Sequence, residues 1–229
     1  MNTFHIKSIP ISIGPKSAIN AWAMHAIDNA PFTPVVTFNT TMIGAHDAPL
    51  RDWLIEHGIF FADGIGISAF MLLRYGIHAP RYPGIELAET ILGHHPGLRI
   101  ALIGARPESL GGTIDWIHRT YPNHCICFSA DGVAPLTPSD VLALSNANPA
   151  LTLVALGCPK QELLMQQLAP VLDSGIAIGV GGSFDVWSGI KKRAPKGVRM
   201  VGLEWLYRLI KEPWRLPRLG RSLWAFIRH

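Results

Sequence analysis

The chain has 229 residues, of which 48% are hydrophobic and 16% charged, so it suffices for one sizeable domain with a buried core and excludes a largely disordered protein. The net charge of +4 comes from one end, because residues 191–229 hold eleven Lys or Arg against two acids, whereas residues 1–190 hold nine against fourteen acids. The longest apolar runs are strand-sized, which predicts no membrane-spanning helix, and the N-terminal sequence lacks the pattern of a secretory signal, which predicts a cytoplasmic protein.

Apolar runs bounded by turn residues alternate with segments of helical period. This pattern predicts an α/β fold with a Rossmann-like, mostly parallel sheet flanked by helices and a basic C-terminal helical appendage. The predicted strands are Ile6–Ile11, Pro34–Phe38, Ile59–Ala62, Arg99–Ile103, Cys125–Ser129, Leu151–Leu156 and Ile176–Val180. The predicted helices are Lys16–Ile27, Pro49–His57, Ile65–Tyr75, Gly84–Leu92, Pro107–Thr120, Pro138–Asn146, Lys160–Leu172 and Pro195–Ile210. We place the α/β core in residues 1–194 and the appendage in residues 195–229.

Polar or glycine-rich turns follow four of the predicted strands. They contain Asn39, just after Thr37; Asp63-Gly-Ile-Gly66; Gly157-Cys-Pro-Lys-Gln-Glu162; and Gly181-Gly-Ser-Phe-Asp185. Because ligands of open parallel sheets collect at the carboxyl ends of the strands, we expect the functional site at this edge.

Asp63 is the best candidate for a catalytic base. A carboxylate at a strand end beside two glycines is partly desolvated and still reachable by a substrate. The alternative, equally favoured by spacing, is that Asp63 caps the helix that begins near Ile65. Gly181 and Gly182 could let backbone N–H groups approach a diphosphate, or could form a tight turn.

Two arginines and a glutamine are further candidates. Arg81 and Arg74 could each bind a phosphate with two parallel hydrogen bonds, although a lone arginine more often faces solvent. Gln161 is an uncharged donor and acceptor suited to sugar hydroxyls, whereas Glu162 beside it is an ordinary acid in a first helical turn.

The histidines and cysteines do not predict a metal site. The candidate ligands that lie nearest one another along the chain are His94, His95, His118, His124, Cys125 and Cys127. Adjacent histidines point in different directions, and the single Cys-x-Cys pair lacks a second pair to complete a zinc site. The cysteines are expected to be reduced thiols.

The C-terminal segment 191–229 interleaves its cations with aromatic and aliphatic residues such as Trp205, Trp214 and Trp224. This composition is typical of segments that lie on an anionic membrane surface. The stretch Pro213–Arg221 breaks the preceding helix and predicts a hinged appendage. Its apolar residues could also bury against a second subunit, so the alternative is a homo-oligomer.

Several motifs together resemble the WecG/TagA/CpsF glycosyltransferases. The C-terminal ones are Gly179-Val-Gly-Gly-Ser-Phe-Asp185, Ser188-Gly189, Arg193-Ala-Pro195, Gly202-Leu-Glu-Trp-Leu-Tyr-Arg-Leu209, Glu212-Pro213 and Arg215. The upstream ones are Asp63-Gly-Ile-Gly66, Arg81-Tyr-Pro-Gly84 with Leu87, and Gly157-Cys-Pro-Lys-Gln-Glu162, in the same order as in the family. The resemblance spans nearly the whole chain.

This resemblance implies a bacterial enzyme that transfers a hexose from a UDP-sugar to a sugar linked to a polyprenyl diphosphate, with inversion, without a required metal or cofactor, at the inner face of the plasma membrane. Asp63 would deprotonate the acceptor hydroxyl. The implied substrate-binding residues are Thr37, Asn39, Arg81, Gly157, Gln161, Gly181 and Gly182. Arg208, Arg215 and Arg218 resemble appendage arginines that close over the nucleotide diphosphate.

The second strand departs from the family pattern, because Thr37-Phe-Asn-Thr-Thr41 lacks the acidic residue that often follows there. Donor identity therefore stays open between N-acetylmannosamine, glucose and N-acetylmannosaminuronic acid. Two rival classes are an NAD(P)-dependent oxidoreductase, disfavoured by the missing dinucleotide fingerprint, and a nucleic-acid binder, disfavoured because the cations are confined to one end. We expect no nucleic-acid partner.

Overall fold

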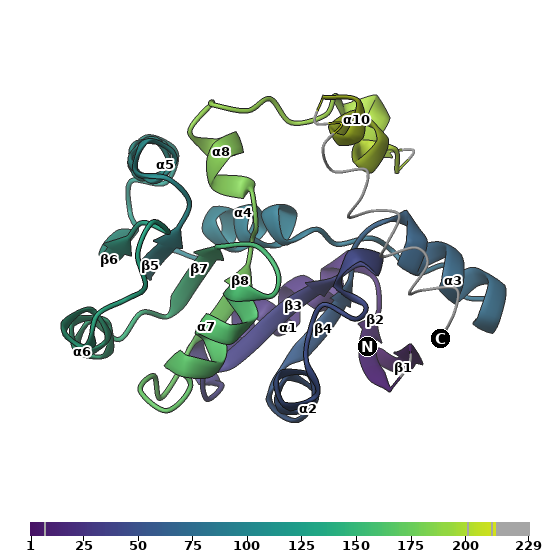
Figure 1. The fold of residues 1–229 in the computed structure, drawn as a ribbon, viewed down its shortest axis with the longest axis horizontal. Coiled ribbons are helices and arrows are strands. Elements are labelled where there is room, and N and C mark those ends of the chain that lie inside the picture. Colours follow the sequence, from purple (N-terminus) through teal and green to yellow (C-terminus); the bar gives the residue numbers. More distant parts are fainter. Residues whose placement is uncertain (7, 201, 212, 214–229) are drawn as a thin grey trace.

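The computed structural model describes residues 1–6, 8–200, 202–211 and 213, with only the backbone described for Thr41 and Arg208. It contains one eight-stranded sheet in the order β1-β2-β4-β3-β8-β7-β5-β6 (Figure 1). The strands are β1 (Asn2–Ile6), β2 (Ile9–Ile13), β3 (Thr33–Phe38), β4 (Ile59–Ala62), β5 (Arg99–Gly104), β6 (Cys125–Ala130), β7 (Leu151–Ala155) and β8 (Ile176–Gly179). All neighbours pair in parallel except β1 with β2, so the predicted fold class is confirmed.

Helices cover both faces of the sheet. The helices are α1 (Lys16–Asn29), α2 (Ala48–His57), α3 (Ile65–Tyr75), α4 (Gly84–His94), α5 (Pro107–Thr120), α6 (Pro138–Ala147), α7 (Lys160–Leu168), α8 (Ser183–Trp187), α9 (Lys196–Met200) and α10 (Glu204–Lys211), with a 3-10 turn at Thr40–Met42. One buried cluster joins α1, α4, α5 and α8 to the sheet. A second cluster joins α2 and α3 to the sheet, and a third joins α6 and α7 to it. Neighbouring strand residues such as Val35 and Val36 belong to different clusters, as the two-residue period of a strand requires.

The first predicted strand, Ile6–Ile11, is wrong, because the chain forms an antiparallel hairpin there. Ile6 pairs with Ile9, and Ser8 has a φ of +67°, in the left-handed region that tight turns use. The alternation of buried and half-buried residues is clear in β2, whereas β1 is mostly exposed. The sequence of β1 therefore lacks the apolar run that identifies the inner strands.

The single predicted helix Pro195–Ile210 is divided into α9 and α10. Gly202 lies between them with a φ of +80°, and its N–H donates to the carbonyl of Arg199. An L side chain rarely adopts this conformation, so glycine permits the break. Among the described residues, no helix is both long and apolar enough to span a bilayer.

The four turns singled out from the sequence do share one edge. Their strands are neighbours in the order β4-β3-β8-β7 and run in parallel, so all four end on the same side of the sheet. We call this edge the carboxyl rim.

Candidate active site

Backbone contacts join the turns that follow β3 and β4. The N–H of Asp63 donates to the carbonyl of Phe38 at 2.8 Å. A Cβ on Gly64 would lie 3.7 Å from the Cβ of Asn39, and one on Gly66 would lie 2.5 Å from Cγ2 of Thr40. These short approaches bring Asn39 and Asp63, two sequence-predicted site residues, to adjoining positions on the carboxyl rim.

Asp63 is half-buried, which is the exposure expected of a base that must meet a substrate. The alternative from the sequence was that Asp63 is the N-cap residue of α3. That position belongs instead to Gly64, which has a φ of +79°. Asp63 therefore stands one residue outside the helix cap, at the end of β4.

Gln161 is buried beneath the end of β8, with 7% of its surface exposed. Its Oε1 accepts from the N–H of Gly181 at 3.3 Å, and its Nε2 donates to Oε1 of Glu162 at 2.7 Å. Its own N–H donates to the carbonyl of Gly157. A Cβ on Gly179 would lie 2.3 Å from Nε2 of Gln161, so glycine there leaves room for the amide.

The other glycines and Thr37 complete the rim. Gly157 and Gly181 have φ values of +74° and +51°, and Gly182 precedes the first turn of α8. Thr37 is 9% exposed, and a Cβ on Gly84, the first residue of α4, would lie 3.2 Å from its Oγ1. The structure thus gathers the sequence-predicted residues of β3, β4, β7 and β8 along one edge.

Arg81 hydrogen-bonds to the backbone of the C-terminal segment. Its Nη2 donates to the carbonyls of Arg199 and Met200, at 2.9 and 3.1 Å, and so satisfies the last turn of α9. Arg81 thereby ties the core to the C-terminal segment. Arg74 is exposed on α3, with its guanidinium carbon 5.5 Å from the centre of the Tyr75 ring.

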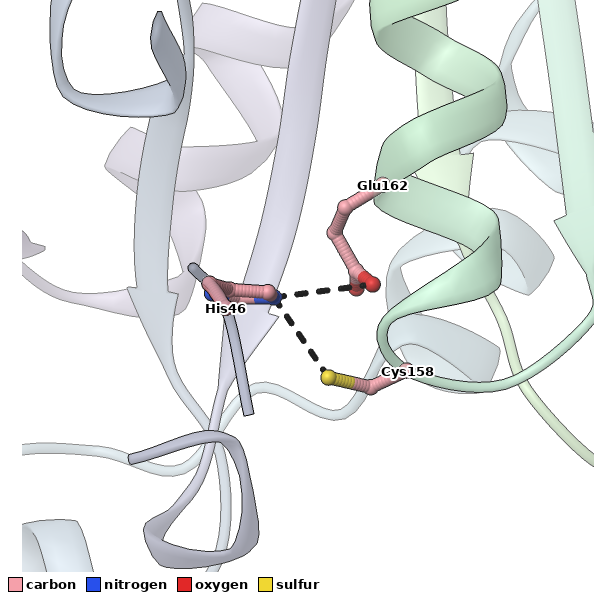
Figure 2. Close-up of side chains that lie close together, drawn as sticks. All are labelled: His46, Cys158 and Glu162. Atoms are coloured by element: carbon pink, nitrogen blue, oxygen red, sulfur yellow. Dashed lines mark hydrogen bonds and ion pairs between the residues drawn. The ribbon is translucent and has the colours of Figure 1, made fainter. Parts of the chain in front are cut away.

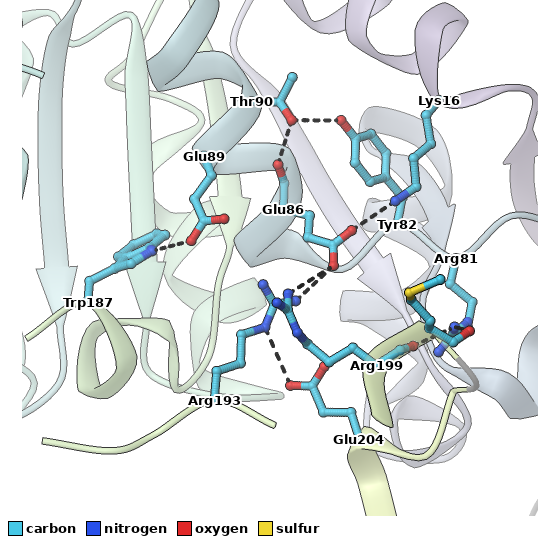
Figure 3. Close-up of polar contacts among 11 residues, drawn as sticks. Lys16, Arg81, Tyr82, Glu86, Glu89, Thr90, Trp187, Arg193, Arg199 and Glu204 are labelled. Atoms are coloured by element: carbon cyan, nitrogen blue, oxygen red, sulfur yellow. Dashed lines mark hydrogen bonds and ion pairs between the residues drawn. The ribbon is translucent and has the colours of Figure 1, made fainter. Parts of the chain in front are cut away.

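Glu86, on the first turn of α4, is the centre of an ion-pair network (Figure 3). Its carboxylate lies 2.9 Å from Nζ of Lys16, 2.9 Å from Nη2 of Arg193 and 3.9 Å from Nη1 of Arg199. Nε of Arg193 lies 3.8 Å from a carboxylate oxygen of Glu204. Within the described part of the chain, the Nε atoms of Arg193 and Arg199 are buried without a hydrogen-bond partner.

A cavity of about 620 Å³ adjoins this network. Its wall comprises Lys16, Ile65, Ser68, His78, Ala79, Arg81, Pro83, Glu86, Lys196, Arg199, Met200 and Glu204. The wall thus carries four cationic side chains and two carboxylates, those of Glu86 and Glu204. This excess of positive charge makes the cavity suited to an anion. Asp63 is not among the wall residues, but Ile65, two positions along the chain, is.

Replacing Glu86 by Gln is expected to remove a pH-dependent part of the stability. Burial by itself raises the pKa of Glu86, but the hydrogen bonds and charges of Lys16 and Arg193 outweigh it, so the pKa lies below its ordinary value of 4.5. A depressed pKa means that the ionised group stabilises the fold above about pH 4.5 and that this contribution is lost as the pH falls through the folded-state pKa.

Thermal unfolding between pH 7 and pH 3 tests this expectation. Wild type should have a higher Tm than Glu86→Gln at pH 7, and the two should converge at the acidic end. Glu108→Gln is a matched control, because Glu108 is an exposed acid in the first turn of α5. A constant difference between wild type and Glu86→Gln over the whole range would contradict the network's role.

The three appendage arginines fall at the limit of the described chain. Arg208 lies in α10 with only its backbone described, and Arg215 and Arg218 lie outside the described residues.

The histidines and cysteines considered from the sequence do not bring three ligand atoms together in the described part of the chain. His124 is buried, accepts from the N–H of Leu98 at its Nδ1 and contacts the carbonyl of Leu92 through its Nε2, so it is a structural histidine. The group that the structure does bring together, among the described residues, is His46, Cys158 and Glu162. Sequence reasoning missed it because no local spacing connects His46 to the other two.

A doubly wound α/β sheet with polar residues along its carboxyl rim is typical of proteins that bind a ligand at that rim, and here a cavity with four cationic side chains adjoins it. The family model described as "Glycosyl transferase WecG/TagA/CpsF family" matches residues 4–229. The chain therefore belongs to the WecG/TagA/CpsF family and is a glycosyltransferase of the hexosyltransferase type.

One curated relative is similar over nearly the full length of the chain. It is the N-acetylglucosaminyldiphosphoundecaprenol N-acetyl-beta-D-mannosaminyltransferase of Bacillus subtilis (strain 168), 33% identical over 224 residues that cover 96% of this chain and 88% of the relative. The family assignment decides against the oxidoreductase alternative.

Proposed function

We propose that this protein transfers an N-acetylmannosamine-type hexose from a UDP-sugar to a sugar linked to a polyprenyl diphosphate, in the synthesis of a bacterial cell-surface polymer. The observation that carries the proposal is the match to the Bacillus subtilis enzyme, whose name states both the lipid-linked acceptor and the transferred sugar. Because that name specifies a β product, an α-linked donor would react with inversion, in one displacement.

In this mechanism Asp63 acts as the general base. Its carboxylate takes the proton of the acceptor hydroxyl while that oxygen attacks the anomeric carbon, and the bond from this carbon to the UDP oxygen breaks. The half-buried position of Asp63 at the carboxyl rim supports this role. Thr37, Asn39, Gln161 and the Gly157 turn would line the sugar site.

The departing UDP carries negative charge that must be stabilised. Guanidinium groups can do this with paired, charge-assisted hydrogen bonds, so the transfer step is proposed to need no metal. The Nε atoms of Arg193 and Arg199, which have no hydrogen-bond partner in the described part of the chain and lie beside the cationic cavity, support a diphosphate site there. Gly181 and Gly182 would add backbone contacts, and Arg208, Arg215 and Arg218 would close over the nucleotide.

Arg81 has a second part in this proposal. Its Nη2 already donates to two carbonyls of α9. A diphosphate bound by Arg81 would therefore change the contacts that hold the C-terminal segment on the core. Exchange of these carbonyls for phosphate oxygens would link nucleotide binding to the position of α9.

The enzyme is proposed to act as a peripheral protein on the inner face of the plasma membrane. Large apolar side chains are exposed on α3 and around α9 and α10, where lysines and arginines accompany them. The most exposed are Leu72, Leu73, Met200 and Ile210. Such a surface binds anionic lipid, and the same residues could instead pack against a second copy of the chain.

The test is an incubation of the full chain with each of several UDP-sugars and a synthetic polyprenyl-diphosphate-linked N-acetylglucosamine. The donors are UDP-N-acetylmannosamine, UDP-glucose and UDP-N-acetylmannosaminuronic acid. We expect lipid-linked disaccharide from the first, with and without a chelator, and faster turnover when the acceptor is in anionic vesicles.

Lipid-linked product from a different donor would change the identity of the transferred hexose but would leave the assignment as a glycosyltransferase unchanged. Failure of every donor to give a lipid-linked product, with folded protein, would overturn the proposed function.

A further inference from the structure

Three potential metal ligands meet where the turn after β7, which belongs to the carboxyl rim, contacts the segment before α2 (Figure 2). His46 precedes α2, Cys158 follows β7, and Glu162 lies in the first turn of α7. Nε2 of His46 lies 3.4 Å from Sγ of Cys158 and 3.6 Å from Oε2 of Glu162. All three ligand atoms lie within 4.8 Å of one another.

The carboxylate of Glu162 is buried with one oxygen unused. The side chains of Glu162 and His46 are 1% and 3% exposed. Oε1 of Glu162 accepts from Gln161, but Oε2 has no hydrogen-bond partner in the described part of the chain. Its 3.6 Å separation from His46 is longer than a hydrogen bond, which normally spans about 2.7–3.2 Å. A buried carboxylate oxygen without a hydrogen bond is costly, so this position favours a bound cation.

The two separations from Nε2 of His46 fit the coordination sphere of a zinc ion, and the third, between Sγ of Cys158 and the carboxylate of Glu162, is within 4.8 Å. Zinc bonds are about 2.3 Å to thiolate sulfur and about 2.0–2.2 Å to imidazole nitrogen or carboxylate oxygen, so tetrahedral ligands lie about 3.3–3.6 Å apart. The observed 3.4 and 3.6 Å match that spacing. One sulfur, one nitrogen and one oxygen form a donor set that favours Zn²⁺ over the oxygen-seeking Mg²⁺ and Ca²⁺.

We propose that His46, Cys158 and Glu162 bind one Zn²⁺ through Nε2, Sγ and a carboxylate oxygen. Cys158 binds as the thiolate, and its proton passes to solvent. Three protein ligands leave a fourth tetrahedral position for a water molecule.

The zinc would be linked to Gly181 on the carboxyl rim through two successive hydrogen bonds. Glu162 accepts from Nε2 of Gln161, and Oε1 of Gln161 accepts from the N–H of Gly181. Fixing Glu162 therefore fixes the orientation of the Gln161 amide. The ion is a positioning element in this scheme and takes no part in the transfer step, so the inference does not depend on the proposed function.

The chain offers well-matched cysteine controls. Cys158 and Cys127 are both half-buried, and Cys125 is exposed. Burial raises the pKa of the Cys127 thiol, and its Sγ donates to the carbonyl of Ile100. Cys127→Ser and Cys125→Ser therefore remove a thiol without touching the proposed site.

The experiment measures zinc in the full chain after incubation with ZnCl₂ and gel filtration. We expect one zinc per chain in wild type, Cys127→Ser and Cys125→Ser, and loss of zinc in Cys158→Ser and His46→Ala. A ligand change should weaken zinc binding by at least the roughly 10–100-fold seen when outer-shell partners are removed.

Cobalt titration of wild type gives an independent result that needs no variant. Co²⁺ bound at this site should show a thiolate-to-metal charge-transfer band, absent in Cys158→Ser. Wild type that retains no zinc and shows no such band would overturn the proposal and leave His46 and Glu162 as an ion pair. Full retention of zinc by Cys158→Ser would overturn it as well.

Discussion

Replacing Asp63 by Asn is expected to lower kcat by about 10²–10⁴, the usual contribution of a general base, while the KM for the UDP-sugar changes little. The amide cannot accept the proton of the acceptor hydroxyl, but it has nearly the shape of the carboxylate. The turn should persist because the N–H of residue 63 still donates to the carbonyl of Phe38. Steady-state rates of UDP release with the lipid-linked acceptor give both constants.

Asp131→Asn is the matched control for this change. Asp131 directly follows β6, as Asp63 follows β4, but β6 is the edge strand farthest from β4 on that side of the sheet. Its carboxylate accepts from the N–H of Val133 within its own turn. Activity should therefore be retained in Asp131→Asn. Equal losses in the two variants, or an unchanged kcat in Asp63→Asn, would exclude Asp63 as the base.

Replacing Gly84 by Ala is expected to damage both the fold and the site. The added Cβ would lie 2.7 Å from the backbone carbonyl oxygen of Gly179 and 3.2 Å from Oγ1 of Thr37. Neither β8 nor α4 can move without displacing its neighbours, so the overpacking should cost about 1–3 kcal/mol. For a chain of this size that corresponds to a Tm lower by roughly 2–12 °C.

Gly84→Ala should lower kcat by more than its loss of folded protein alone would explain. A shift of α4 would displace Glu86 and Arg81 together with the rim, and a misplacement of about 1 Å can cost on the order of 10² in rate. Thermal unfolding and kcat, measured on the same preparation, test both expectations.

Gly111→Ala provides the comparison, because Gly111 is exposed within α5 and a Cβ there meets no atom within 4 Å. Alanine is the better helix former, so this variant should be more stable by up to about 1 kcal/mol, with unchanged activity. If Gly84→Ala behaved like Gly111→Ala, the close packing of α4 on the rim would be refuted.

The inner part of the fold could be predicted from the sequence because its signals are local. Apolar runs such as Leu151–Leu156, bounded by turn residues, identified the strands from β3 to β8. Parallel neighbours end on one side of a sheet, so the same runs also placed Asp63 and Gln161 on the carboxyl rim. The family motifs lie in these turns, which is why the resemblance and the sheet indicate the same edge.

The errors fall where local signals are weak or conflict with the tertiary structure. The hairpin of β1 and β2 was missed because β1 is mostly exposed and has no apolar run. The predicted helix Pro195–Ile210 has a helical period on both sides of Gly202, and only the positive φ of that glycine divides it.

The sequence alone determined the α/β class, the positions of the inner strands along the chain and the turns that carry the polar residues, because hydrophobic period and turn chemistry act over a few neighbouring positions. Only the tertiary structure decided which distant side chains meet. Arg81 binds a carbonyl 118 residues away, and His46 contacts Cys158 across 112 residues. No spacing along the chain encodes such contacts, since they arise when helices pack on a sheet whose strand order differs from the order of the sequence.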